Sequence, residues 1–166
     1  MAYEGRVLAW NGPVTKAPTL SGTGAQADNL FTVTGSCELI VWGELTTGGT
    51  FNLTGLYLEV DDGTAQVDIT ADGSALSNLA AGTMVYRSGL AASAIAVSDN
   101  AAGDVIDCAD AGKDQVHVPF IVTKKTGVAT HVRTNYDTTD NPCSGQITWT
   151  CYWRALSSDG AVVAAS

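Results

Sequence analysis

Residues 145–155 read GQITWTCYWRA, and this stretch decides the fold class. Large apolar side chains stand at every second position: Ile147, Trp149, Cys151 and Trp153. Polar or amphipathic side chains fill the positions between them: Gln146, Thr148, Thr150, Tyr152 and Arg154. A period of two is the pattern of a β-strand with one buried face. The stretch therefore predicts a strand that turns both tryptophans toward a core.

Similar runs recur along the chain and are separated by Gly, Asp and Asn. The predicted strands are 30–34, 37–45, 53–60, 66–70, 84–88, 94–98, 115–124 and 128–136. Pro119 predicts that its run is an edge strand or carries a bulge, because proline has no N–H to donate. Residues 74–82 are expected to form a helical turn that stops at Gly82. Many short strands with frequent turns predict an all-β fold with little helix, a β-sandwich or jelly-roll-like domain.

The composition agrees with strands and turns. The chain has 20 Thr and 18 Gly but only 4 Glu and 4 Lys, the residues that usually fill the surfaces of helices. With 166 residues, of which 45% are hydrophobic, it is long enough for one real core. Residues 11–29 lack apolar periodicity. We therefore expect a loop-rich N-terminal arm or extended segment at 1–29 and a single β-sandwich domain at 30–166.

The charge balance argues against two classes of partner. Only 15% of the residues are charged, and 17 acidic against 8 basic residues give a net charge of −9. This acid excess would repel nucleic-acid phosphates and anionic lipid, so we expect neither as a partner. The first ten residues lack a long apolar run, and no window approaches a membrane span. We expect no secretory signal and synthesis in the cytoplasm.

The four cysteines show no CxxC spacing, so a zinc site is not expected. Cys37 and Cys151 fall on the apolar sides of predicted strands and are expected to be small buried side chains. Cys108 and Cys143 lie in Asp-rich loops, where a disulfide between them remains open.

The sequence has few features typical of a catalytic or metal-binding site. There is no G-x-S-x-G nucleophile motif, and His117 and His131 lie on polar strand faces. The acidic loops at 61–63, 99–114 and 137–141 do not match a calcium-binding loop and are expected to be solvated turns. Glycan hydrolysis needs a pair of facing carboxylates, and three glutamates lie on or beside strands: Glu38, Glu44 and Glu59. Whether two of them form such a pair remains open. We predict no catalytic, cofactor or metal site, and a protein that is not an enzyme.

Aromatic side chains are the remaining candidates for function. If Trp149 and Trp153 face the core, four other residues become candidates for a partner surface: Trp10, Ile40, Trp42 and Tyr152. Aromatic side chains on a flat sheet suit contacts with a protein or stacking on a sugar. The alternative is that a second sheet or a loop covers them.

Two stretches resemble small β-rich structural proteins of tailed bacteriophages. Residues 145–165 resemble a C-terminal pattern in which a strand with Trp and Tyr runs through a Leu-Ser turn into a Gly-Ala-x-Val-x-Ala-Ala tail. The turn lacks the usual proline, since Arg154 and Ala155 precede Leu156. Residues 29–47 (NLFTVTGSCELIVWGELTT) resemble the strand pair FTVTG…GE(V)TT of the same proteins.

The resemblance implies a capsid decoration, or cement, protein. Such a protein binds the outer capsid surface of the virion, contacts the major capsid protein and bridges capsomers, often as a homotrimer. A carbohydrate-binding or host-attachment module of a phage tail or fibre is the alternative. Either one is made in the cytoplasm of the bacterial host and works by shape and surface, without a cofactor.

Overall fold

The structure is a computed structural model that describes residues 10–21, 24–47, 52–73, 76–77, 80–89, 92–98, 118–123, 125–138 and 145–166. Strand β12 (Gly145–Ala155) forms over the whole stretch that predicts it. Ile147, Trp149 and Cys151 are fully buried, whereas Thr148 and Thr150 between them are half-buried on the opposite face. The alternation in the sequence thus becomes the inner and outer face of a sheet.

Strand β12 belongs to a seven-stranded antiparallel sheet, here called sheet A. Its other members are β1 (Asn11–Lys16), β2 (Thr19–Leu20), β4 (Cys37–Thr47), β8 (Met84–Tyr86), β9 (Ala96–Ser98) and β10 (Phe120–Val122). The order is β1-β12-β4-β8-β9, with β2 beside β12 and β10 beside β4. The long β4–β12 pair therefore forms the centre of sheet A.

A second antiparallel sheet of six strands, sheet B, lies against the first. Its members are β3 (Gly24–Thr34), β5 (Asn52–Asp61), β6 (Gln66–Asp68), β7 (Leu76–Ser77), β11 (Thr130–Thr138) and β13 (Ala161–Ala164). The order is β13-β3-β11-β5-β6, and β7 pairs with β5. β11 between β3 and β5 forms its centre.

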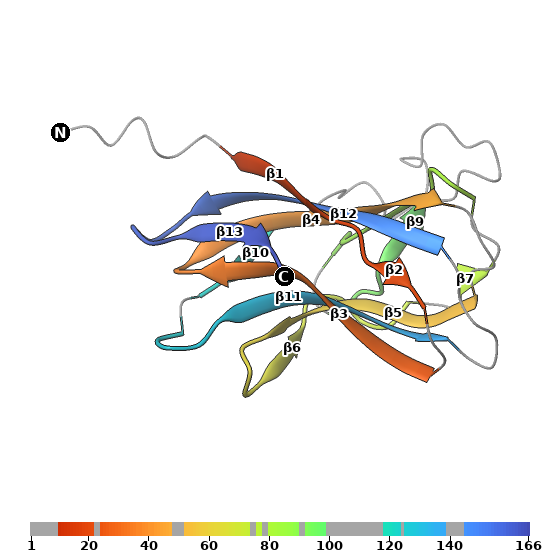
Figure 1. The fold of residues 1–166 in the computed structure, drawn as a ribbon, viewed down its shortest axis with the longest axis horizontal. Coiled ribbons are helices and arrows are strands. Elements are labelled where there is room, and N and C mark those ends of the chain that lie inside the picture. Colours follow the sequence, from red (N-terminus) through yellow and green to blue (C-terminus); the bar gives the residue numbers. More distant parts are fainter. Residues whose placement is uncertain are drawn as a thin grey trace.

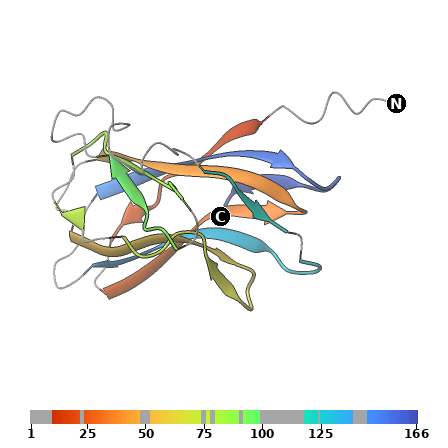
Figure 2. The same ribbon diagram turned by 180° about the vertical axis from the view of Figure 1, so that it is seen from behind.

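The two sheets pack face to face as a sandwich (Figure 1), and the same two layers are seen from behind in Figure 2. Their inner faces share one cluster of buried apolar residues, with Trp149 from sheet A and Phe31 from sheet B among the largest. On one side of the sandwich β1 and β13 lie close together, where Lys16 Nζ donates to the Ala165 carbonyl at 2.7 Å. The all-β sandwich prediction is confirmed.

Residues 11–29 correct one prediction. They contain β1, β2 and the first half of β3, whereas the sequence predicts strands only from Leu30 onward. β1 pairs with β12 at the edge of sheet A and leaves most of its side chains exposed, so it needs no alternation of its own. β3 runs straight across the predicted boundary at residue 29.

The helical turn predicted at 74–82 is wrong. Leu76–Ser77 forms strand β7, which pairs with β5 through Asn52 and Leu53. Pairing with a neighbouring strand overrides the weak helical preference of this short Ala- and Leu-containing segment. No helix in the part of the chain that the structure describes is long and apolar enough to cross a membrane.

The predictions for Cys37 and Cys151 are confirmed, since both are fully buried free thiols in sheet A. Burial raises the pKa of both thiols, that of Cys151 to about 12. Both therefore stay protonated at neutral pH and act as small apolar side chains. Cys108, Cys143 and His117 lie outside the described residues.

Candidate partner surface

The outer face of sheet A carries the four residues that the sequence nominates. Ile40 and Trp42 come from β4, Tyr152 comes from β12, and Trp10 directly precedes β1. In the register of the β4–β12 pair Tyr152 stands opposite Ile40, and Trp42 stands opposite Thr150. Trp42 and Tyr152 are therefore diagonal neighbours on one face, within reach of each other's rings.

The rings of Trp42 and Tyr152 stack on each other. Their centroids lie 5.4 Å apart and their planes differ by 11°. This offset stacking of two large rings is typical of favourable aromatic pairs. Both side chains stay half-buried rather than covered, so the pair presents an apolar surface of fixed shape.

Trp10 is tied to the same face through Arg154. The guanidinium carbon of Arg154 lies 5.4 Å from the centre of the Trp10 ring, a cation–π distance. Arg154 also forms an ion pair with Glu38, which stands opposite it on β4. The four residues that the sequence nominates and Arg154 together are called the aromatic band: Trp10, Ile40, Trp42, Tyr152 and Arg154.

Sequence reasoning missed three residues of this face. Arg154 joins Trp10 to the rest of the band, and nothing local in the sequence indicates that contact. Ile121 on β10 stands opposite Glu38 and is 60% exposed, so it extends the apolar surface beyond β4. Tyr86 on β8 stands opposite Trp42 and is buried. For Ile121 the alternation along its strand was the available signal.

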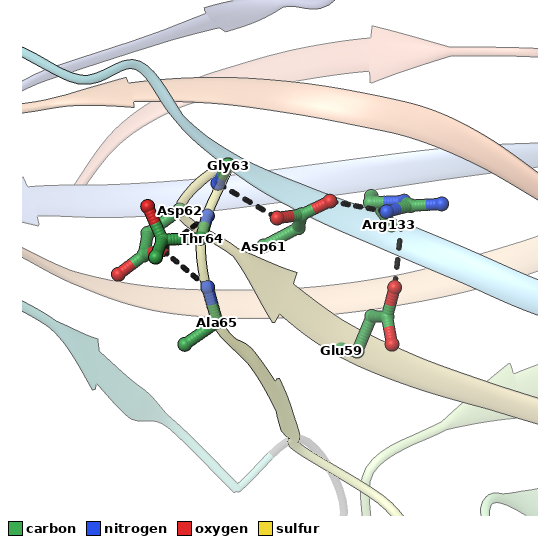
Figure 3. Close-up of polar contacts among 7 residues, drawn as sticks. All are labelled: Glu59, Asp61, Asp62, Gly63, Thr64, Ala65 and Arg133. Atoms are coloured by element: carbon green, nitrogen blue, oxygen red, sulfur yellow. Dashed lines mark hydrogen bonds and ion pairs between the residues drawn. The ribbon is translucent and has the colours of Figure 1, made fainter.

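A second polar arrangement lies on the outer face of sheet B. Arg133 on β11 stands opposite Glu59 on β5, and its side chain contacts both Glu59 and Asp61 (Figure 3). Arg133 Nε lies 3.4 Å from Glu59 Oε1. Glu59 is only 3% exposed, so this arginine compensates a buried carboxylate. The cluster joins β5 to β11 in the middle of sheet B.

The turn between β5 and β6 uses its two aspartates as caps (Figure 3). Asp61 accepts from the Gly63 N–H at 2.7 Å, and Asp62 accepts from the N–H groups of Thr64 and Ala65 at 2.8 and 2.7 Å. The Gly63 N–H and Arg133 lower the pKa of Asp61 against the opposing effect of burial. These carboxylates are committed to the turn.

Lys125 forms an ion pair with Asp62 at 2.7 Å. Lys125 and the two N–H groups of the turn lower the pKa of Asp62 to about 2. In the described part of the chain, no group of three or more His, Cys, Asp or Glu side chains is arranged to hold a metal ion. The acidic loops at 99–114 and at 139–141 lie outside the described residues.

The three glutamates considered for glycan hydrolysis do not meet in one cleft. Glu38 and Glu44 are six residues apart on β4, which is about 20 Å along an extended strand. Glu59 lies on the other sheet and faces Arg133. Paired catalytic carboxylates stand roughly 5 to 10 Å apart.

His131 lies on the outer face of sheet B, where its Nδ1 is 3.3 Å from Thr32 Oγ1.

Comparisons with known proteins assign no family. No protein-family model matches the chain, and no curated protein matches it significantly. Among solved structures, the infectious bursal disease virus VP2 subviral particle is similar with a TM-score of 0.22 and 14% identity, over 94% of this chain and 41% of that one. Structures of the Gt and Gx strains of the same virus both have TM-scores of 0.20, with 12% and 13% identity over 93% of this chain.

This chain covers 41%, 38% and 40% of the three viral chains, so it spans about two fifths of their length. Their weak similarity assigns neither a family nor a function. What the chain can bind is therefore inferred from its own surfaces.

Proposed function

We propose that this chain is a bacteriophage capsid decoration protein that docks on the outer capsid surface through the aromatic band of sheet A. The observation that carries the proposal is the stacked Trp42–Tyr152 pair, with Trp10 and Arg154 beside it, on the outer face of sheet A. Tryptophan, tyrosine and arginine are the residues most enriched among those that dominate binding energy at protein interfaces. The resemblance of residues 29–47 and 145–165 to phage structural proteins supports the choice of partner.

The surroundings of the band also suit a protein partner. Glu38 and the half-buried Thr148 and Thr150 lie on the same outer face as the rings. An apolar centre with polar neighbours is the usual arrangement of an interface between proteins. An interface of standard size buries about 800 Å² on each partner, which is comparable to one face of a sheet.

The edges of the sheets support an oligomer. β1 and β13 lie close together at one side of the sandwich, and each pairs with a single strand of its own sheet. Unpaired edges invite association with other strands, and a closed ring of copies protects them. A homotrimer that bridges neighbouring capsomers would use this side between copies and the aromatic band against the shell.

Co-sedimentation with empty shells of the same virus's major capsid protein tests the proposal. We expect the wild-type chain to bind saturably, and Trp42→Ala or Tyr152→Ala to weaken binding at least about tenfold, as for central interface residues. Val67→Thr is the matched control and should bind like wild type, because Val67 is an exposed residue of β6 at the opposite edge of sheet B from β13. Folded wild-type protein that fails to bind shells would refute the proposal.

Light scattering after size exclusion tests the trimer separately. A trimer has three times the mass of the 17.1 kDa chain, or about 51 kDa. A monomer that nevertheless binds shells would limit the trimer to the assembled particle, whereas a monomer with no affinity for shells would remove both parts of the proposal.

The second candidate is a glycan-binding module of a phage tail or fibre, and the same rings favour it. Sugars stack on exposed ring faces, and Trp42 and Tyr152 are the aromatic pair on this surface. Glycan-array binding that is lost in Trp42→Ala, together with no binding to shells, would favour this function over decoration.

A further inference from the structure

A cavity of about 540 Å³ opens at the side of the sandwich where β6 and β10 are edge strands of sheet B and sheet A. Its walls are largely apolar and include Val60, Val67, Ile69, Phe120 and Val122. Val67 at its rim is 63% exposed. The size falls within the range of about 300 to 1,000 Å³ that is typical of small-molecule sites.

Arg87 lines the same cavity and is only 9% exposed. Its Nε donates to the Ile69 carbonyl at 3.1 Å, and its Nη1 donates to the carbonyls of Val118 and Pro119 at 3.1 and 2.9 Å. The guanidinium carbon lies 6.0 Å from the centre of the Phe120 ring. Three carbonyls thus hold the plane of the guanidinium in place and leave Nη2 without a partner among the described residues.

The charge of Arg87 is not neutralised by the described carboxylates around the cavity. Asp62 is engaged by Lys125 and by the N–H groups of its turn. Asp68 stands opposite Glu59 and is exposed on the outer face of sheet B. Burial lowers the pKa of Arg87, because loss of hydration disfavours the charged form of its side chain. A buried charge of this kind is stabilised by an anion that reaches it.

We propose that this cavity binds an amphiphilic monocarboxylate, with the carboxylate on Arg87 Nη2 and the hydrocarbon chain against Val67, Ile69 and Phe120. Thr123 and Thr130 also line the cavity and add hydroxyl groups to its wall. The chain would replace water along the apolar wall, and the carboxylate would complete the hydrogen bonds of a guanidinium that is already oriented. This site is independent of the aromatic band and of the proposed function.

Isothermal titration with decanoate, below its micelle concentration, tests the site. We expect one decanoate per chain, and at least tenfold weaker binding of decan-1-ol, which has the same chain without the charge. Val67→Asp places a carboxylate at the rim and should weaken decanoate binding at least tenfold. The matched control is Val163→Asp, which should bind decanoate like wild type. Val163 is a similarly exposed valine on β13, at the opposite edge of sheet B from β6.

Arg87→Lys keeps the charge but loses the forked donors, and it should also weaken decanoate binding if it folds. Where it does not fold, the Val67 and Val163 variants decide the question, because both positions are exposed. No binding of decanoate to folded wild-type chain, equal binding of decan-1-ol, or unchanged binding by Val67→Asp would each overturn the proposal.

Discussion

At the scale of single residues, Gly43 shows how closely the core of sheet A is packed. Gly43 stands opposite Trp149, whose indole is fully buried. A Cβ built on Gly43 would lie 2.6 Å from Ile147 Cγ2, 2.9 Å from Val85 Cγ2 and 3.0 Å from Trp149 Cε3. The absence of a side chain at position 43 therefore makes the room that the tryptophan occupies.

Gly43→Ala is expected to destabilise the fold by about 1 to 3 kcal/mol, because a methyl group in this filled space forces its neighbours to move. The free energy of unfolding from urea titration measures this loss. Glu44→Ala is the control, since Glu44 is exposed on the other face of the same strand and should change stability by no more than about 0.5 kcal/mol. Equal stability of the two variants would contradict this account of the packing.

At the scale of elements, the β5–β6 turn links stability to pH through Asp62. The pKa of its carboxyl is about 2 in the fold, against about 3.9 in an unfolded chain. The folded state thus favours the carboxylate, so its contribution is fully present above pH of about 4 and is lost as pH falls toward 2.

Asp62→Asn is expected to lower the melting temperature at neutral pH and to flatten its decline between pH 4 and pH 2. Melting temperatures recorded across this range by circular dichroism test both effects. Asp72→Asn, at an exposed aspartate outside the turn, serves as the control and should keep the wild-type slope. An Asp62→Asn curve parallel to wild type would show that the turn carboxylate is not the linked group.

β13 gives a test of how the C-terminal strand pairs. It pairs with β3 of the same chain, with Val162 4% exposed and Val163 58% exposed. Val162→Asp should therefore cost at least about 3 kcal/mol, since it buries a charge without a partner, whereas Val163→Asp should stay within about 0.5 kcal/mol. Denaturant unfolding of the two variants measures the difference. Similar losses in both would mean that β13 does not dock with this face inward.

At the scale of the whole molecule, the two sheets share one core. Sheet A contributes Trp149 and Leu39 to it, and sheet B contributes Phe31 and Leu58. Neither sheet can lose its partner without exposing this apolar surface to water. Each layer therefore depends on the other for its stability.

We expect a single cooperative unfolding transition. Tryptophan fluorescence, to which Trp42, Trp149 and Trp153 of sheet A contribute, and far-ultraviolet circular dichroism, which reports both sheets, should give the same urea midpoint. Gly43→Ala in sheet A and Val162→Asp in sheet B should shift both signals together. Separate midpoints would show that the sheets unfold independently.

Local alternation in the sequence was enough to predict much of this architecture. The period of two in 145–155 and 128–136 predicts which side chains of β12 and β11 enter the core, because successive side chains of a strand point to opposite faces. The alternation in 37–45 and 145–155 also correctly places Trp42 and Tyr152 on the face away from the core. These are properties of neighbouring residues in one strand, so the sequence alone determines them.

Pairing between distant segments was decided only by the tertiary structure. β1 has little alternation of its own and becomes a strand because β12 offers it an edge. Trp10 meets Arg154, and Glu59 meets Arg133, through strand registers that join residues far apart in the chain. The burial of Arg87 against three carbonyls likewise depends on segments from both sheets. Such contacts depend on which strands become neighbours and in what register, and one strand's pattern does not contain that information.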